Sequence, residues 1–167
     1  MPRSFRGRAD SPTAVADIHG AFAREEYWAA RLATGGPGTT LNSLVVGDDG
    51  AVAVRYTQQV GRQLLPAAVA GLVPGEVRME YTESWSPVER GQADGRIDVT
   101  VSGNLGSCRA NTWLEPAGRG SRLRFEGTVK VRIPLVGGSL EKAIGAELAA
   151  SVPSVMCFTT TWIADNA

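Results

Sequence analysis

The chain has 167 residues, 43% of them apolar and 20% charged, which suits one folded domain over residues 1–167 and excludes a disordered chain. Seventeen basic and seventeen acidic side chains cancel, so the formal net charge is zero. Because phosphate binding needs a positive surface, this balance argues against nucleic acid as the main partner.

The N-terminal part predicts one strand and two short helices. Residues 3–9 begin the strand, and Ser11 with Pro12 indicates a helix start, because Ser caps free N–H groups and Pro fits the first turn. Residues 24–33 form the second helix, which a run rich in Gly and Pro ends. The first helix carries one stripe at helical spacing, made of Val15, Ile18 and Phe22.

Strands dominate the middle of the chain. They are expected at residues 40–46, 52–60, 77–87, 95–102, 107–114 and 122–133. Residues 47–50 predict a hairpin turn, and residues 64–73 have helical rather than alternating character. Apolar and polar side chains alternate along the strands at 77–87 and 122–133, which is typical of an antiparallel sheet covered on one face.

A long helix is predicted at the C-terminus. Ser139 is its expected N-cap, about twenty-five residues follow, and Gly137 and Gly138 are a candidate hinge. Pro153 removes one backbone hydrogen bond and predicts a kink near Ala149. One stripe recurs in steps of three or four residues: Leu140, Ile144, Leu148, Val152, Val155, Thr159 and Trp162.

Two features bear on location. No apolar run follows the basic N-terminus, unlike a secretory signal, and no stretch reaches the ~18 consecutive apolar residues of a membrane span. Cys108 and Cys157 are far apart and lack C-x-x-C spacing, which is typical of reduced, buried thiols. These features predict a cytoplasmic protein with no integral membrane association.

Four segments carry a resemblance to a known superfamily. They are EYWAARL at 26–32, TESWSP at 82–87, VRIPLVGG at 131–138 followed by Glu141 and Lys142, and FTTTW at 158–162. Over residues 2–163 the chain resembles an actinobacterial branch of the START-like (SRPBCC) superfamily, which includes Bet v 1-like proteins and polyketide cyclases. The resemblance implies an α+β helix-grip fold, with a curved antiparallel sheet of six to seven strands, two short helices and a long C-terminal helix enclosing a cavity.

Packing supports the cavity independently. A curved sheet that grips a helix by its rim leaves a gap, which large side chains or a ligand must fill. The terminal helix carries small residues that would leave space if they face the sheet: Ala143, Gly145, Ala146, Ala149, Ala150, Ser151 and Ser154. The candidates for lining a ligand cavity are Tyr56, Met79, Tyr81, Glu83, Trp85, Val99, Trp113, Phe125, Val129, Leu148, Val152 and Val155, with ordinary core packing as the alternative.

Few side chains suggest catalysis. Alternation places Glu83 among apolar residues, where burial favours the protonated form of a carboxyl group and suits a general acid or base, unless an arginine pairs with it. Trp113 shares a face with Arg109, so either it lies outside the sheet or a bulge turns it inward. His19, the only histidine, is expected to be structural. No spacing predicts a metal site or a nucleotide fingerprint, so no cofactor is expected.

Three functions remain open at this level. The preferred one is a module that carries, sequesters or senses an apolar small molecule such as a lipid, polyketide or aromatic metabolite. The second is an enzyme of the polyketide cyclase or dehydratase kind, with Glu83, Tyr81 and Arg109 as first suspects. The third is a protein-interaction domain with a collapsed pocket, which would expose an apolar patch.

Overall fold

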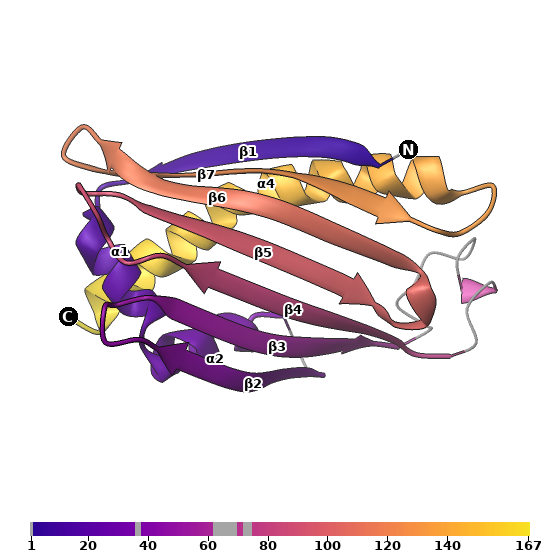
Figure 1. Ribbon diagram of the computed structural model, residues 1–167, viewed down its shortest axis with the longest axis horizontal. Helices are drawn as coiled ribbons and strands as arrows, with labels where there is room; N and C mark the ends of the chain where they lie inside the picture. Colours follow the sequence, from indigo (N-terminus) through magenta and orange to yellow (C-terminus); the bar gives the residue numbers. More distant parts are fainter. Residues whose placement is uncertain (1, 36–37, 62–69, 72–74) are drawn as a thin grey trace.

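Figure 1 presents the computed structural model, which describes residues 2–35, 38–61, 70–71 and 75–167. Strand β1 (Arg3–Ser11) is followed by helices α1 (Val15–Phe22) and α2 (Glu25–Ala33), and the chain ends in helix α4 (Gly137–Asp165). Between them lie β2 (Thr39–Val46), β3 (Val52–Val60), β4 (Val77–Trp85), β5 (Ala93–Val101), β6 (Gly106–Ala117) and β7 (Gly120–Val131). Most of the helical insertion predicted at residues 64–73 lies outside the described residues.

The seven strands form one antiparallel sheet in the order β1-β7-β6-β5-β4-β3-β2. Every neighbouring pair of strands is consecutive in the chain except the β1–β7 pair, which joins the first strand to the last. The sheet curves across the front of Figure 1, with α4 behind it and the two short helices at one end. The predicted α+β helix-grip fold is confirmed.

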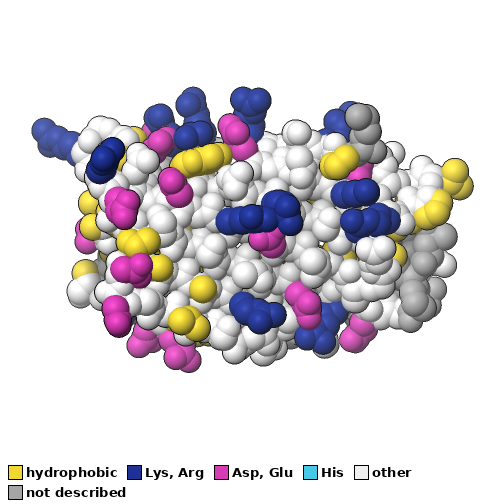
Figure 2. Space-filling view, in the orientation of Figure 1, with side chains coloured by type: hydrophobic (Ala, Val, Ile, Leu, Met, Phe, Trp, Pro, Cys, Tyr) yellow, Lys and Arg dark blue, Asp and Glu magenta, His cyan; other side chains and the backbone are white. Residues whose placement is uncertain are grey.

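Alternation along the strands separates the two faces of the sheet. In β4 the side chains of Val77, Glu83 and Trp85 are buried, whereas the intervening polar side chains are exposed. Figure 2 shows the face opposite α4, where basic and acidic side chains are interspersed. The inner face of the sheet therefore supplies the core, as the period of two residues predicted.

Both predicted helix caps are wrong. Ser11 remains in the β1–β7 ladder opposite Ser121, and α1 begins after Ala14 without a side-chain cap. The Ser11 hydroxyl accepts the backbone N–H of Thr13 at 3.1 Å instead of capping α1. Helix α4 begins at Gly137, because the Gly137 amide already donates to the Ile133 carbonyl at 3.0 Å, so Ser139 lies inside the first turn.

Helix α4 is longer than expected, with 29 residues, and it continues through Pro153, whose side chain is exposed. The kink near Ala149 and the glycine hinge stay predictions. By length and composition alone, α4 would qualify as a membrane span. In the fold α4 packs mainly against β1 and β7, which is the usual arrangement of a core helix.

The position of α4 across the sheet is set by small residues at the β1 edge. A Cβ atom at Gly7 would lie 2.7 Å from the Ala149 carbonyl oxygen and 2.8 Å from Cγ2 of Val152, so only glycine permits this approach. Gly145 lies over Phe5 less closely, because a Cβ atom there would be 3.5 Å from the Phe5 Cβ, an ordinary contact. The helix thus rests on β1 and β7, which leaves room between α4 and the strands at the opposite edge.

Gly7→Ala is therefore expected to lower the free energy of unfolding by about 1–3 kcal/mol, because the methyl group meets backbone that cannot rotate away. Urea denaturation followed by circular dichroism measures the change. Gly20→Ala is the matched control: a Cβ there meets nothing within 4 Å, and alanine favours the helix, so stability should be unchanged or higher. Equal losses in both variants would contradict the close packing of α4 on β1.

Candidate functional site

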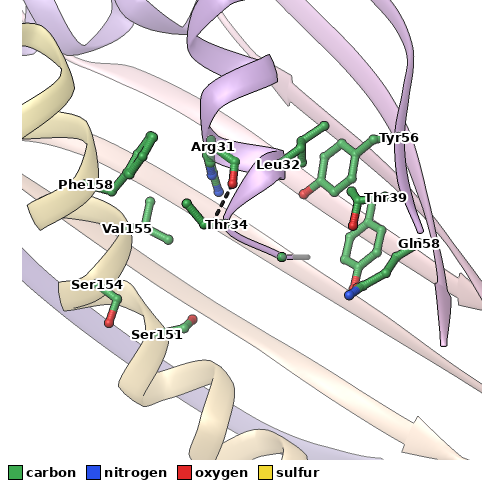
Figure 3. A pocket seen from close by; sticks show the side chains of 12 residues that line it. Arg31, Leu32, Thr34, Thr39, Tyr56, Gln58, Ser151, Ser154, Val155 and Phe158 are labelled. Atoms are coloured by element: carbon green, nitrogen blue, oxygen red, sulfur yellow. Dashed lines mark hydrogen bonds between the residues drawn. The ribbon is translucent and has the colours of Figure 1, made fainter. Parts of the chain in front are cut away.

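A cleft of about 410 Å³ opens where α4 separates from the sheet. Figure 3 shows its two sides, with Ser151, Ser154, Val155 and Phe158 of α4 facing Tyr56 and Gln58 across the end of α2. The remaining lining residues are Arg31, Leu32, Thr34, Gly35, Thr39 and Tyr81. One side of the cleft is therefore a helix face of small and apolar residues, and the other is a strand surface with aromatic rings.

Two tyrosines form the strand side of the cleft. Tyr56 of β3 and Tyr81 of β4 lie opposite each other in the ladder, and their rings stack with centroids 4.6 Å apart at an angle of 11°. The Tyr81 hydroxyl donates to Oε1 of Gln58 at 3.3 Å. The stacked rings present a flat apolar surface with polar groups at its margin, which can orient an apolar ligand.

Arg31, on the last turn of α2, is the charged residue that reaches the cleft. Its guanidinium lies over the Trp28 ring, 4.8 Å from the centroid, and its side chain is only 17% exposed. Burial by itself would lower the pKa of Arg31, but Tyr27, Glu83 and Tyr56 outweigh burial and hold that pKa above its ordinary value. Arg31 therefore remains charged inside the fold.

Tyr27 connects Arg31 to α4. The Thr159 hydroxyl donates to the Val155 carbonyl at 2.7 Å, and it lies 2.7 Å from the Tyr27 hydroxyl. Because the Thr159 proton is used in the first bond, Tyr27 must donate in the second. The Tyr27 oxygen is then free to accept the N–H of Arg31 at 3.5 Å. This chain fixes the orientation of α2 relative to α4.

Glu83 provides the opposite charge. Glu83 is only 2% exposed. Its Oε1 atom accepts the indole N–H of Trp85 at 3.1 Å and lies 3.8 Å from the Arg31 guanidinium. The other oxygen, Oε2, has no hydrogen-bond partner among the described residues. A buried carboxylate with one unpaired oxygen is costly, so its contact with Arg31 is needed to hold the charge there.

Tyr56 completes the cluster as a neutral donor. Burial raises the pKa of Tyr56 well above its ordinary range, and the charge of Glu83 raises it further, against the opposing effect of Arg31. Burial also raises the pKa of Tyr81. Both phenols therefore keep their protons at any physiological pH and can donate hydrogen bonds.

The structure brings together only some of the predicted cavity residues. Tyr56, Tyr81 and Val155 line the cleft, and Glu83 lies in the adjacent charge pair. Trp85 and Val152 belong to the main buried core instead. Phe125, Val129 and Leu148 pack at the β1 side of α4. Met79 and Val99 lie on the inner side of the sheet, away from the cleft.

Trp113 and Arg109 lie on the outer face of the sheet. The β6–β7 register runs without a bulge, so Trp113 stays opposite Arg124, whose guanidinium lies 4.6 Å above the indole ring. Arg109 is exposed and pairs with Asp98 at 3.0 Å. The outer of the two positions considered for Trp113 is the one found, so Trp113 does not line the cleft and Arg109 cannot act with Glu83.

The sequence did not single out Arg31 as a site residue. Arginines on short helices usually extend into solvent, and the residue is buried here because Tyr27 and Trp28, four and three positions earlier, share its helix face. An arginine three and four residues after two large aromatic residues, together with a carboxylate on the apolar face of a strand, was the signal in the sequence that could have identified Arg31. Thr39, Gln58 and Phe158 carried no such signal.

The remaining chemically reactive side chains lie elsewhere. His19 is buried, and its Nε2 lies 2.8 Å from the Ser86 carbonyl, which is a structural contact between α1 and the end of β4. Burial raises the pKa of the Cys108 thiol to about 11. Cys157 is an exposed free cysteine on α4, so the prediction that both thiols are buried is wrong for Cys157. No group of three potential metal ligands occurs within the described ranges.

Comparison with known proteins places the chain in a family. The model of the DUF2505 family, described as proteins of unknown function, matches residues 7–163. Uncharacterized proteins of Mycobacterium tuberculosis and Mycobacterium bovis are 37% identical over 177 residues, covering 99% of this chain and 99% of each relative.

Solved structures of low sequence identity share the fold. A Thermus thermophilus protein has a TM-score of 0.60 at 16% identity, covering 99% of both chains. Ara h 8.0201 has a TM-score of 0.53 at 12% identity over 99% of both chains. Norcoclaurine synthase from Thalictrum flavum has a TM-score of 0.53 at 16% identity, covering 98% of this chain and 94% of that chain. The chain therefore has the START-like (SRPBCC) fold and belongs to the DUF2505 family.

Proposed function

We propose that the protein is a single cytoplasmic domain that binds an apolar small molecule in the cleft between α4 and β2–β4, as a carrier, a sequestering protein or a sensor. The observation that carries the proposal is the cleft itself, about 410 Å³ in volume, with stacked Tyr56 and Tyr81 on one side and Val155 and Phe158 on the other. Burying a ligand there would contribute ~25 cal/mol per Å² of apolar surface.

Native mass spectrometry of the freshly purified protein, followed by denaturing extraction, tests the proposal. We expect a stoichiometric mass excess that denaturation releases as a free lipid, polyketide or aromatic compound. A bare protein mass that persists after incubation with a panel of fatty acids and aromatic polyketides would contradict it.

Ser154→Phe should abolish the mass excess, because the ring fills the cleft from an exposed position on α4 and need not disturb the core. Ala146→Phe is the matched control. It adds the same side chain to the same helix at an exposed site that does not line the cleft. The control should retain the ligand, and equal ligand loss in both variants would place the binding site elsewhere.

The unpaired Oε2 of Glu83 favours one alternative, an enzyme that uses this buried carboxyl group as a general acid or base. Glu83→Gln would then abolish turnover of the extracted compound even at saturating concentration. An unchanged product profile in that variant would exclude the catalytic role.

A further inference from the structure

The charges at the cleft already balance before any ligand binds. Arg31 lines the cleft, and Glu83, 3.8 Å away and almost fully buried, cancels its charge from within the fold. No other Lys, Arg, Asp or Glu is among the lining residues that the structure describes. A molecule entering the cleft therefore meets a polar region with strong dipoles and no net charge.

Two of the residues that line the cleft, Arg31 and Tyr56, bring available hydrogen-bond donors to it. A guanidinium has five N–H donors. One N–H of Arg31 donates to Tyr27 at 3.5 Å, and Glu83 is 3.8 Å away, so most of the donors of Arg31 remain available. The neutral hydroxyl of Tyr56 also has no hydrogen-bond partner among the described residues, although Tyr56 lines the cleft. Both residues can donate to an oxygen atom of a ligand.

We propose that the molecule bound here has an uncharged polar end with an acceptor oxygen, such as an amide or ketone carbonyl, which accepts from Arg31 and Tyr56 while the apolar remainder lies against Val155 and Phe158. This inference rests on the proposed function of the same cleft. A carboxylate would add an uncompensated negative charge close to buried Glu83, and an ammonium group would face Arg31. Only an uncharged end preserves the charge balance.

Isothermal titration calorimetry with decanamide, decanoate and decylammonium at neutral pH tests the inference, because these probes share one chain length and differ in charge. Decanamide should bind the wild-type protein about tenfold more tightly than either charged probe, or better. Tighter binding of a charged probe, or equal binding of all three, would overturn the inference while leaving the proposed binding function intact. If no probe binds and native mass spectrometry shows a bare protein, both proposals fail.

Two variants alter the charge balance in opposite directions. Glu83→Gln leaves Arg31 uncompensated and should move the preference to decanoate, whereas Arg31→Gln should move it to decylammonium. The double variant restores zero net charge and should again favour decanamide. If Arg31→Gln does not fold by circular dichroism, the wild-type ranking and the Glu83→Gln ranking decide the question. An unchanged ranking in Glu83→Gln would contradict the role of charge balance.

Discussion

Replacing Arg31 by Met is expected to lower the free energy of unfolding by about 3–5 kcal/mol, because it leaves the buried carboxylate of Glu83 without its cation. The loss exceeds that of an ordinary surface arginine, because the Arg31 side chain is only 17% exposed and also covers the Trp28 ring. Urea denaturation monitored by tryptophan fluorescence and by circular dichroism measures the change.

The double variant Arg31→Met with Glu83→Gln separates charge from packing. In the wild type the indole N–H of Trp85 donates to Glu83 at 3.1 Å, and the amide introduced by Glu83→Gln would keep an acceptor for it. The double variant would therefore retain this hydrogen bond and contain no charge at the site. Most of the stability lost in the single variant should therefore return. A double variant as unstable as Arg31→Met alone would mean that packing over Trp28, rather than the charge pair, accounts for the loss.

Alternation along the strands predicted most of the fold. It placed Glu83 and Trp85 on the inner face of β4 because a period of two residues decides which side a strand buries. The helix starts were wrong at Ser11 and Ser139 because a cap residue is a local signal, and tertiary contacts override it. At Ser11 the backbone continues the β1–β7 ladder, a pairing between residues far apart in the chain that no local pattern encodes.

The position of the candidate cleft was harder to predict than the fold, because a cleft depends on how layers sit relative to one another. Alternation identifies an inward side chain but not its position along the sheet, so Tyr56 at the cleft and Val129 beneath the β1 side of α4 looked alike. What separates them is the close approach of α4 at Gly7, a contact between segments far apart in sequence. Arg31 became a site residue only because α2 packs across the opposite edge.

Trp28→Ala is expected to be as damaging as any single change in the chain, with a loss of about 3–5 kcal/mol. Trp28 is completely buried, its rings contact those of Phe22, Tyr27 and Tyr56, and its indole N–H donates to the Phe22 carbonyl at 2.7 Å. Removing the indole leaves a cavity between α2 and β3 and takes away the support beneath Arg31. Chemical denaturation measures the stability, and under the proposed function titration with decanamide should show weaker binding.

Trp113→Ala is the matched control, because it removes the same side chain from the outer face of the sheet. Trp113 is half-buried beneath the guanidinium of Arg124, which can cover the vacated surface with its own aliphatic stem. Its loss should be about 1 kcal/mol, with ligand binding unchanged. Comparable losses in the two variants would contradict the placement of Trp113 outside the core. A large loss confined to Trp28 would show that the aromatic cluster beneath the cleft holds α2, and with it Arg31, against the sheet.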